Sequence, residues 1–163
     1  MKPEALASVA KDQLNLVLGF FSRVDAKASV VLAVDTGMAG YLASHFPSPF
    51  AIPIWQLLVP ILSFLLIVGS FWHLYKGAFP NLAGGNQSLV YFREIAKRTE
   101  AKFIDEFAAQ SETDYAKDML GQAWRNSEIL TEKFDRLKWA FLFMAIAAIP
   151  WAFSLVLFAV KRS

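Results

Sequence analysis

Formal charges are missing from three stretches of the chain. Ala28–Phe46, Ile52–Tyr75 and Trp139–Val160 contain one formal charge between them, Asp35. Each stretch is about 20 residues long, the length that an α-helix needs to cross the hydrocarbon core of a bilayer. A helix of a soluble domain rarely continues so far without a charged face. The pattern therefore predicts three transmembrane helices, with a polar segment, 76–138, between the second and the third.

The N-terminal segment has the periodicity of an amphipathic helix. Residues 3–24 place apolar side chains three and four residues apart. Pro3 is favourable in the first turn of such a helix. We expect the helix to lie along the membrane surface or to pack on the cytoplasmic helices. Its apolar stripe consists of Leu6, Ala10, Leu14, Val17, Phe21 and Val24.

The polar segment between the second and third stretches predicts a helical hairpin. A first helix is expected to begin at Gln87 or Ser88, and a second near Ser111. On the first helix, Glu94 and Arg98 are four residues apart and are expected to pair. The second helix continues into the last apolar stretch, which predicts a rigid rod of about 30 residues, roughly 45 Å long.

These patterns predict an all-α membrane protein with three transmembrane helices, an N-terminal amphipathic helix and a cytoplasmic helical hairpin continuous with the last span. The expected segments are the amphipathic helix 1–27, a transmembrane hairpin 28–75, a cytoplasmic helical segment 76–138, and a third transmembrane helix with a short tail, 139–163. The tight, extended turn of the transmembrane hairpin is predicted by Pro47, Pro49 and Pro53.

Composition and charge support this interpretation and give an orientation. Apolar residues make up 56% of the chain, charged residues 18%, and the mean hydropathy is +0.39. Basic residues flank the cytoplasmic ends of the predicted spans, which places the N-terminus and 76–138 in the cytoplasm. The C-terminus then lies outside, where Lys161 and Arg162 oppose the rule, so a re-entrant third helix stays open. Interfacial residues on the second span are Trp72, His73, Tyr75 and Lys76.

Residue patterns of catalytic and metal sites are missing from the sequence. It has no cysteine, and its two histidines, His45 and His73, lie near opposite ends of the first two spans. Walker loops, nucleophile elbows and zinc-protease motifs are absent. We therefore expect neither an enzyme nor a metal site, and no nucleic-acid partner.

Asp35 is a candidate for a membrane function because a carboxyl group inside a span costs a few kcal/mol unless it faces a partner or water. Thr36, Gly37 and Gly40 lie beside it, and such small residues let helices approach closely. Two interpretations stay open: a carboxylate that faces a pore or another subunit, and a neutral Asp that is hydrogen-bonded to a neighbouring helix.

The junction before the first cytoplasmic helix is a candidate ligand site. Glycines precede a helix N-terminus, where free N–H groups and the helix dipole suit a phosphate, and an aromatic ring and an arginine nearby suit a base. The alternative is an ordinary turn followed by a solvated basic face. The candidate ligand-binding residues are Asn86, Ser88, Tyr91, Arg93 and Lys97.

Five strings of residues resemble the membrane effectors of Pycsar antiphage systems over nearly the whole chain. They are Asp25-Ala-Lys27-Ala-Ser29, Phe79-Pro80, Ser88–Ala96, Asn126–Leu130 and Lys133-Phe134. The plan of the chain is also similar to the SLATT effectors, which are small helical membrane proteins of related defence systems.

This resemblance implies a two-gene bacterial defence module. A partner nucleotide cyclase makes a cyclic pyrimidine nucleotide, cyclic UMP or cyclic CMP, and the effector, expected in the bacterial inner membrane, impairs that membrane and stops growth or kills the cell before phage mature. No pattern of short strands predicts a separate nucleotide-binding domain. Either the helices of 76–138 bind the nucleotide, or another component relays the signal.

The resemblance also singles out Asp25, Lys27 and Ser29 as the strongest family motif, with a role as a hinge before the first span, in binding lipid phosphate, or in signalling. The expected mechanism is a ligand-shifted equilibrium between a resting bundle and a membrane-disrupting homo-oligomer. The alternatives are a holin-like or channel-forming protein without nucleotide control, and a constitutive membrane-interaction subunit.

Overall fold

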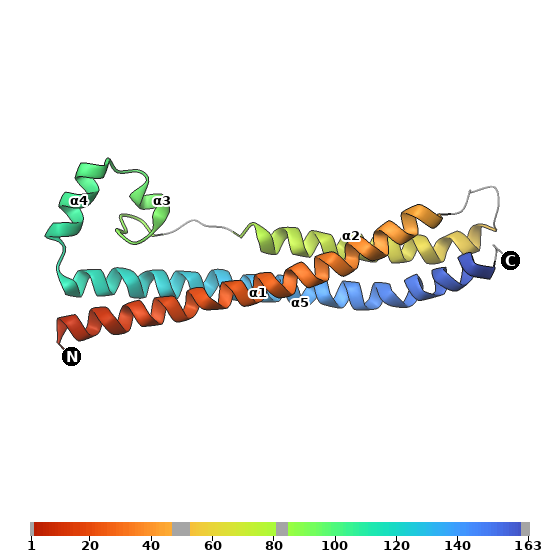
Figure 1. The fold of residues 1–163 in the computed structure, drawn as a ribbon, viewed down its shortest axis with the longest axis horizontal. Coiled ribbons are helices and arrows are strands. Elements are labelled where there is room, and N and C mark those ends of the chain that lie inside the picture. The colour runs from red at the N-terminus through yellow and green to blue at the C-terminus, as the bar shows by residue number, and fades with distance from the viewer. Residues whose placement is uncertain (1, 47–52, 81–84, 161–163) are drawn as a thin grey trace. The chain divides into compact units, whose positions relative to one another are not determined.

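The computed structural model describes residues 2–46, 53–80 and 85–160, and in these residues all regular structure is helical. The prediction of an all-α protein is thus confirmed. Five helices follow one another in the described ranges (Figure 1): α1 (Pro3–His45), α2 (Ile54–Ala78), α3 (Phe92–Ile95), α4 (Glu100–Ala109) and α5 (Glu112–Val160). The predicted turn at Pro47 and Pro49 lies outside the described residues.

The chain forms two compact units. The polar unit consists of Met1–Arg23 and Asn81–Glu132, and the apolar unit of Val24–Pro80 and Lys133–Ser163. Both α1 and α5 contribute residues to each unit.

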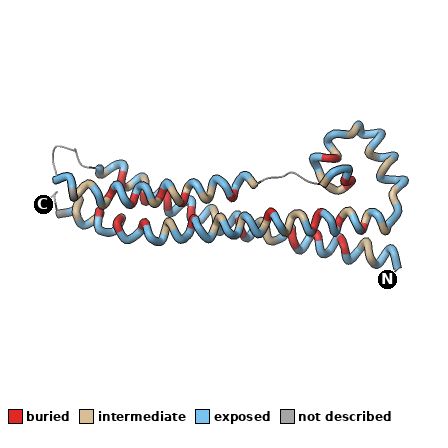
Figure 2. Tube along the Cα trace, turned by 180° about the vertical axis from the view of Figure 1, so that it is seen from behind, coloured by how far each residue is buried: buried red, intermediate tan, exposed pale blue. Residues whose placement is uncertain are grey.

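Helix α1 continues through the motif Asp25–Ser29, where the sequence suggested a hinge. Its buried residues recur at intervals of three, four or seven, and the same spacing holds on both sides of the motif. This is a heptad repeat, which keeps one face of a helix against a partner over many turns. Figure 2 shows buried positions spaced along the long helices, in red. Because no residue interrupts the repeat, the amphipathic helix and the first apolar stretch form one helix. The buried positions are Ala10, Leu14, Val17, Val24, Val31, Asp35, Met38 and Leu42.

The core of the polar unit lies between the first part of α1 and the first part of α5. Here α1 contributes residues of the predicted amphipathic stripe, and the facing residues of α5 are small or flexible. Small alanines let two helices approach closely, and methionine fills the irregular space that remains. The buried cluster consists of Ala10, Leu14, Val17, Ala116, Met119 and Ala123.

Small residues on α2, seven positions apart, face α5 in the apolar unit. The Ser63 hydroxyl donates to the main-chain oxygen of Ala147 at 3.2 Å, and the Ser70 hydroxyl approaches that of Ala140 at 2.9 Å. One heptad further along, a Cβ on Gly77 would lie 3.2 Å from Cβ of Arg136. Small residues at helix interfaces let the two backbones pack closely in a membrane. We call Ser63, Ser70 and Gly77 the small-residue seam.

In the described part of the chain, two helices are long and apolar enough to cross a membrane: α2 over Gln56–Ala78 and α5 over Glu112–Ala159. Most of their apolar residues are exposed, as expected of a surface that faces lipid rather than a protein core. The third predicted span, 28–46, lies in α1, where Asp35 and the small polar residues around it reduce the hydropathy.

The first predicted cytoplasmic helix is divided into two. A turn over residues 96–99 separates α3 from α4, because the Thr99 side chain accepts a hydrogen bond from the Lys102 N–H and starts a new helix. The predicted Glu94–Arg98 pair is therefore wrong: Arg98 contacts the main-chain oxygen of Glu94 and pairs with Glu106.

The second predicted cytoplasmic helix begins as expected, after Ser111. The Ser111 hydroxyl accepts a hydrogen bond from the Asp114 N–H at 3.1 Å and lies 2.7 Å from the Asp114 carboxylate. The first of these contacts satisfies one of the N–H donors that the first turn of a helix leaves free. Helix α5 then continues without interruption to Val160, which confirms the prediction of one long helix.

Candidate functional site

The candidate ligand residues lie together on one loop and the short helix α3 of the polar unit. The loop contains two residues in the left-handed region, Gly85 (φ 71°) and Gln87 (φ 63°). Glycine adopts this conformation without strain, but glutamine does so only where its surroundings hold it there. A Cβ on Gly85 would lie 2.7 Å from the Tyr91 ring, so the glycine also lets that ring pack against the loop.

Arg98 holds this loop in place. Its guanidinium donates to the main-chain oxygens of Gln87 at 2.9 Å and Glu94 at 2.7 Å, and its Nε donates to Glu106 at 2.6 Å. The Arg98 side chain is only 11% exposed. Because a guanidinium has five donors in a fixed plane, one side chain fixes several carbonyl groups at once. The strained Gln87 is thus held by a residue eleven positions away.

The sequence predicted that the loop N–H groups could bind a phosphate. In the structure, N–H groups of this loop have partners within the polar unit. Gln87 N donates to the Glu94 carboxylate at 3.2 Å, and Leu89 N to the Asp118 carboxylate at 2.8 Å. The next two N–H groups, of Val90 and Tyr91, donate to the Ser88 hydroxyl. Two carboxylates of the protein thus occupy donors that would suit an anion.

Two glutamates of this network have lowered pKa values. The side-chain hydrogen bond from Lys97, followed by the bond from Gln87 N–H, lowers the pKa of Glu94. The hydrogen bond from Arg98 lowers the pKa of Glu106. In each case a bonded donor favours the charged carboxylate over its neutral form. The loop is therefore held most firmly when both glutamates are ionised.

The five candidate ligand residues have different environments within this segment. Asn86 and Arg93 are exposed, and Lys97 pairs with Glu94 while its side chain stays 68% exposed. Ser88 is buried and forms the turn, and Tyr91 packs on Gly85 and the Phe92 ring. The cationic side chains of Arg93 and Lys97 and the ring of Tyr91 thus lie next to the loop.

Asp35 is completely buried in the apolar unit, among α1, α2 and α5. The Ser70 hydroxyl lies 2.5 Å from Oδ2 of Asp35 and 2.9 Å from the main-chain oxygen of Ala140. A hydroxyl has one proton and cannot donate to both oxygens at once. A protonated Asp35 would donate to Ser70 and leave the Ser70 proton for Ala140, so the neutral form satisfies both contacts. The other oxygen, Oδ1, has no hydrogen-bond partner among the described residues.

The small residues beside Asp35 do not bring helices of this chain together. Thr36 is exposed and donates to the Leu32 oxygen of its own helix, and a Cβ on Gly37 or Gly40 would meet no described atom within 4 Å. The close approach lies instead at Gly69, where a Cβ would be 2.8 Å from the Phe143 ring. The role of Thr36, Gly37 and Gly40 at a pore or between copies of the chain stays a prediction.

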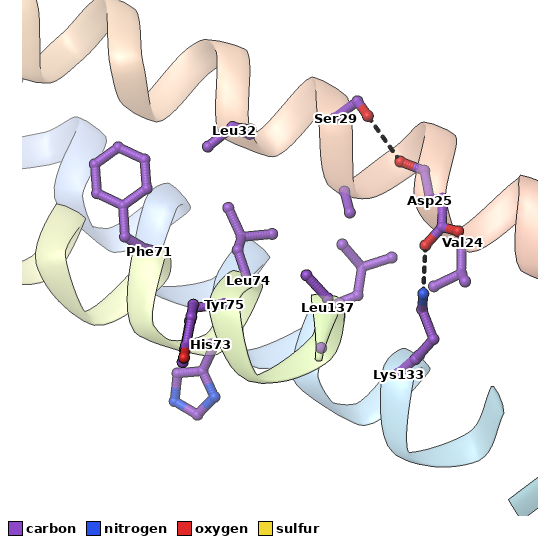
Figure 3. Close-up of a pocket in the computed structure, with 13 residues that line it drawn as sticks. Val24, Asp25, Ser29, Leu32, Phe71, His73, Leu74, Tyr75, Lys133 and Leu137 are labelled. Carbon is purple, nitrogen blue, oxygen red and sulfur yellow. Dashed lines mark hydrogen bonds and ion pairs between the residues drawn. The ribbon is translucent and has the colours of Figure 1, made fainter. Parts of the chain in front are cut away.

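Asp25 and Ser29 of the family motif line a cavity of about 360 Å³ in the apolar unit (Figure 3). The Asp25 carboxylate pairs with Lys133 of α5 at 2.6 Å, and the Ser29 hydroxyl donates to the main-chain oxygen of Asp25. Lys133 is only 11% exposed, whereas Asp25 is 57% exposed. The pair therefore joins two helices at the edge of the apolar stretches. Lys27 lies on another side of α1 and lines a second cavity.

Sequence reasoning missed the residues that hold each candidate site in place. From the sequence, Arg98 was interpreted as part of a solvated helix surface. Ser70 lies in a stretch that was interpreted only as apolar. The spacing of Ser63, Ser70 and Gly77 was a signal that could have identified the contact with α5. Arg98 had no such signal, because its partners are main-chain oxygens of a loop.

The chain was compared with protein families, with curated proteins and with solved structures. The Pycsar effector protein domain, PycTM, matches residues 9–160, a range that covers most of both units and every residue of the candidate sites. No curated protein and no solved structure matches the chain. The match confirms the resemblance found in the sequence. Since it covers nearly the whole chain, the protein belongs to the PycTM family of Pycsar effectors, which implies a nucleotide-activated antiphage membrane effector.

Proposed function

We propose that this protein responds to cyclic UMP or cyclic CMP, made by a partner nucleotide cyclase, and impairs the bacterial inner membrane, so that an infected cell stops growing or dies. Family membership supports the effector class and the cyclase partner. The two long apolar helices support a site of action in the membrane. The choice of a pyrimidine nucleotide rests on the family resemblance.

The observation that carries the membrane part of the proposal is the buried pair of Asp35 and Ser70. A carboxyl group in the centre of an apolar bundle costs a few kcal/mol, and here it has one side-chain partner. An arrangement that exposes Asp35 to water would recover part of this cost. The resting bundle is therefore poised to exchange with a hydrated arrangement.

In this proposal the protein crosses the membrane three times. The segments are the amphipathic helix 1–27, the transmembrane hairpin 28–75, the cytoplasmic segment 76–138 and the third span with its tail, 139–163. The N-terminus and 76–138 face the cytoplasm, as the distribution of Lys and Arg favours.

The nucleotide binds at the loop and α3 of the polar unit. Arg93 and Lys97 provide positive charge for the cyclic phosphate, Tyr91 offers a ring for the base, and Asn86 and Ser88 belong to the loop that holds them. Because internal carboxylates occupy the loop N–H groups, side chains rather than the backbone contact the ligand first. A nucleotide phosphate that displaced Glu94 from Lys97 would loosen the loop.

Binding would then change the population of the open arrangement. A ligand that binds the active state about 100 times better shifts the equilibrium by about 2.7 kcal/mol, which is sufficient for a poised protein. Helix α5 provides the path, since it contributes residues to both units. The exposed residues Thr36, Gly37 and Gly40 offer a surface on which copies of the chain assemble into a homo-oligomer.

The test is depolarisation of bacterial cells that express the protein together with cyclases for cyclic UMP, cyclic CMP, cyclic AMP or cyclic GMP. A membrane-potential dye should report depolarisation with a pyrimidine cyclic nucleotide, and an inactive cyclase is the control. Depolarisation without any nucleotide would favour the holin-like or channel alternative. Depolarisation with every cyclic nucleotide would contradict the pyrimidine assignment alone.

A further inference from the structure

A second cavity of about 430 Å³ opens between α1 and α5 of the apolar unit. Its volume is within the range of about 300–1,000 Å³ that is typical of ligand pockets. Apolar side chains form most of its wall, and three of them are exposed: Val30, Phe134 and Phe141. The cavity is therefore an apolar surface that the described residues leave uncovered.

Two lysines, Lys27 of α1 and Lys138 of α5, lie at this cavity, and none of its lining residues is acidic. Within the described ranges, neither lysine lies within ion-pair distance of a carboxylate. This differs from the first cavity, where Lys133 pairs with Asp25. The second cavity thus combines apolar walls with positive charge that no nearby carboxylate neutralises.

Both lysines are placed where the apolar stretches begin. Lys27 directly precedes Ala28, and Lys138 directly precedes Trp139. On α2, Lys76 lies over the Trp72 ring at 5.0 Å, which is the pairing of aromatic and basic side chains found at a membrane interface. The positive charge of the cavity is therefore expected at the level of the lipid headgroups.

We propose that this cavity binds one anionic phospholipid of the cytoplasmic leaflet, with the headgroup phosphate at Lys27 and Lys138. Its acyl chain lies along Val30, Phe141 and Met144. Charge complementarity selects the headgroup, because basic pockets between transmembrane helices on the cytoplasmic side suit anionic lipids. The apolar wall selects a lipid over a soluble phosphate, which would leave that wall in contact with water. The bound lipid would fill the space between α1 and α5 in the resting bundle.

The test is lipid binding to the full-length protein in mild detergent, followed by native mass spectrometry during titration with phosphatidylglycerol or phosphatidylcholine. The parent should prefer phosphatidylglycerol. The double variant Lys27→Gln/Lys138→Gln should lose this preference, by about fivefold in affinity for each lysine removed. Lys2→Gln/Lys11→Gln is the matched control, because it removes the same charge from the N-terminal part of the chain, outside the cavity, and it should retain the preference.

A second variant tests the acyl-chain part of the cavity without touching the lysines. Val30→Trp places a large ring in the cavity from an exposed position and should reduce lipid binding, while circular dichroism should show unchanged helix content. Glycerol phosphate, which has the anionic group but no acyl chains, should not displace the lipid. Equal affinity of the parent for the two lipids, retained preference in the double lysine variant, or displacement by glycerol phosphate would overturn the proposal.

Discussion

The two units of the molecule use polar groups in opposite ways. In the polar unit, Arg98 contacts several oxygens and neighbouring carboxylates accept loop N–H groups, so polar contacts define the conformation of the loop. In the apolar unit, one buried carboxyl group, Asp35, has one side-chain partner, Ser70. Each exposed ion pair contributes little in water, whereas a single unpaired polar group inside a membrane is costly. The difference teaches that the loss of a single buried polar contact should be costly in the apolar unit, while in the polar unit the contacts are distributed over a network.

The largest effect is expected from Gly69→Leu in the apolar unit. A Cβ at this position already lies 2.8 Å from the Phe143 ring, so a leucine must push α2 and α5 apart. Overpacking of this kind costs about 1–3 kcal/mol or more. Thermal unfolding in detergent, followed by circular dichroism, should show a clearly lower midpoint. Gly37→Leu is the matched control, since no described atom lies within 4 Å of a Cβ there, and equal midpoints for the two variants would contradict the packing described.

Ser70→Ala sharpens the comparison by removing the partner of Asp35. A buried polar group that loses its hydrogen bond costs about 1–3 kcal/mol. We expect lower stability in detergent and increased dye leakage from cells without any nucleotide. Ser44→Ala is the control, because the Ser44 hydroxyl is bonded only to its own helix and its neighbour. In the double variant Asp35→Leu/Ser70→Ala the stability should recover, and strictly additive effects would show that the two side chains are independent.

Arg98→Gln tests the network of the polar unit. The Arg98 side chain is only 11% exposed, so water does not fully replace its hydrogen bonds to the loop oxygens when they are lost. Hydrogen exchange at Leu89 and Val90 should become faster, while exchange in α2 should not change. Arg93→Gln, at an exposed position, should leave exchange unchanged and weaken the response to nucleotide. Equal exchange in the parent and Arg98→Gln would contradict the role of Arg98 in holding the loop.

The smallest effect is a pH dependence confined to the polar unit. Glu94 and Glu106 have lowered pKa values in the folded chain, because Lys97 and Arg98, respectively, donate hydrogen bonds to them. Their contribution is therefore fully present above the usual glutamate pKa and is lost as the pH falls through the lowered values. Peptide-resolved hydrogen exchange, corrected for the intrinsic pH dependence, should show the 85–109 segment opening on acidification. Glu94→Gln/Glu106→Gln should remove this dependence, and Glu100→Gln should not.

Helix positions were largely predictable from the sequence, because the periodicity of apolar residues can be recognised within a short stretch of the chain. The start of α5 after Ser111 followed from a local capping pattern, and its continuation followed from the lack of a helix breaker. The break between α3 and α4 was missed, since apolar periodicity shows neither the Thr99 cap nor the contact of Arg98 with Glu106. Continuity of α1 was missed because the heptad repeat was followed only to Val24.

The candidate sites were predictable by residue type but not by contact. Asp35 was evident as a single charge in an apolar stretch, whereas Ser70 is 35 positions away and became its partner only through the packing of α2 on α1. The ligand residues lie in one segment because they are close in sequence. Internal carboxylates on their N–H groups were not foreseen, since Asp118 reaches the loop from α5.

The small-residue seam has a consequence for how α5 can move along α2. Ser63, Ser70 and Gly77 repeat every seven residues, and Ser63 and Ser70 face Ala147 and Ala140 of α5, which are also seven residues apart. A displacement of fewer than seven residues would place larger side chains such as Phe143 against the seam, whereas a shift of one full heptad, about 10 Å, would again place one of the two serines opposite an alanine of α5. Sliding of α5 along α2 would therefore be favoured in steps of one heptad. The first step would separate Ser70 from Ala140.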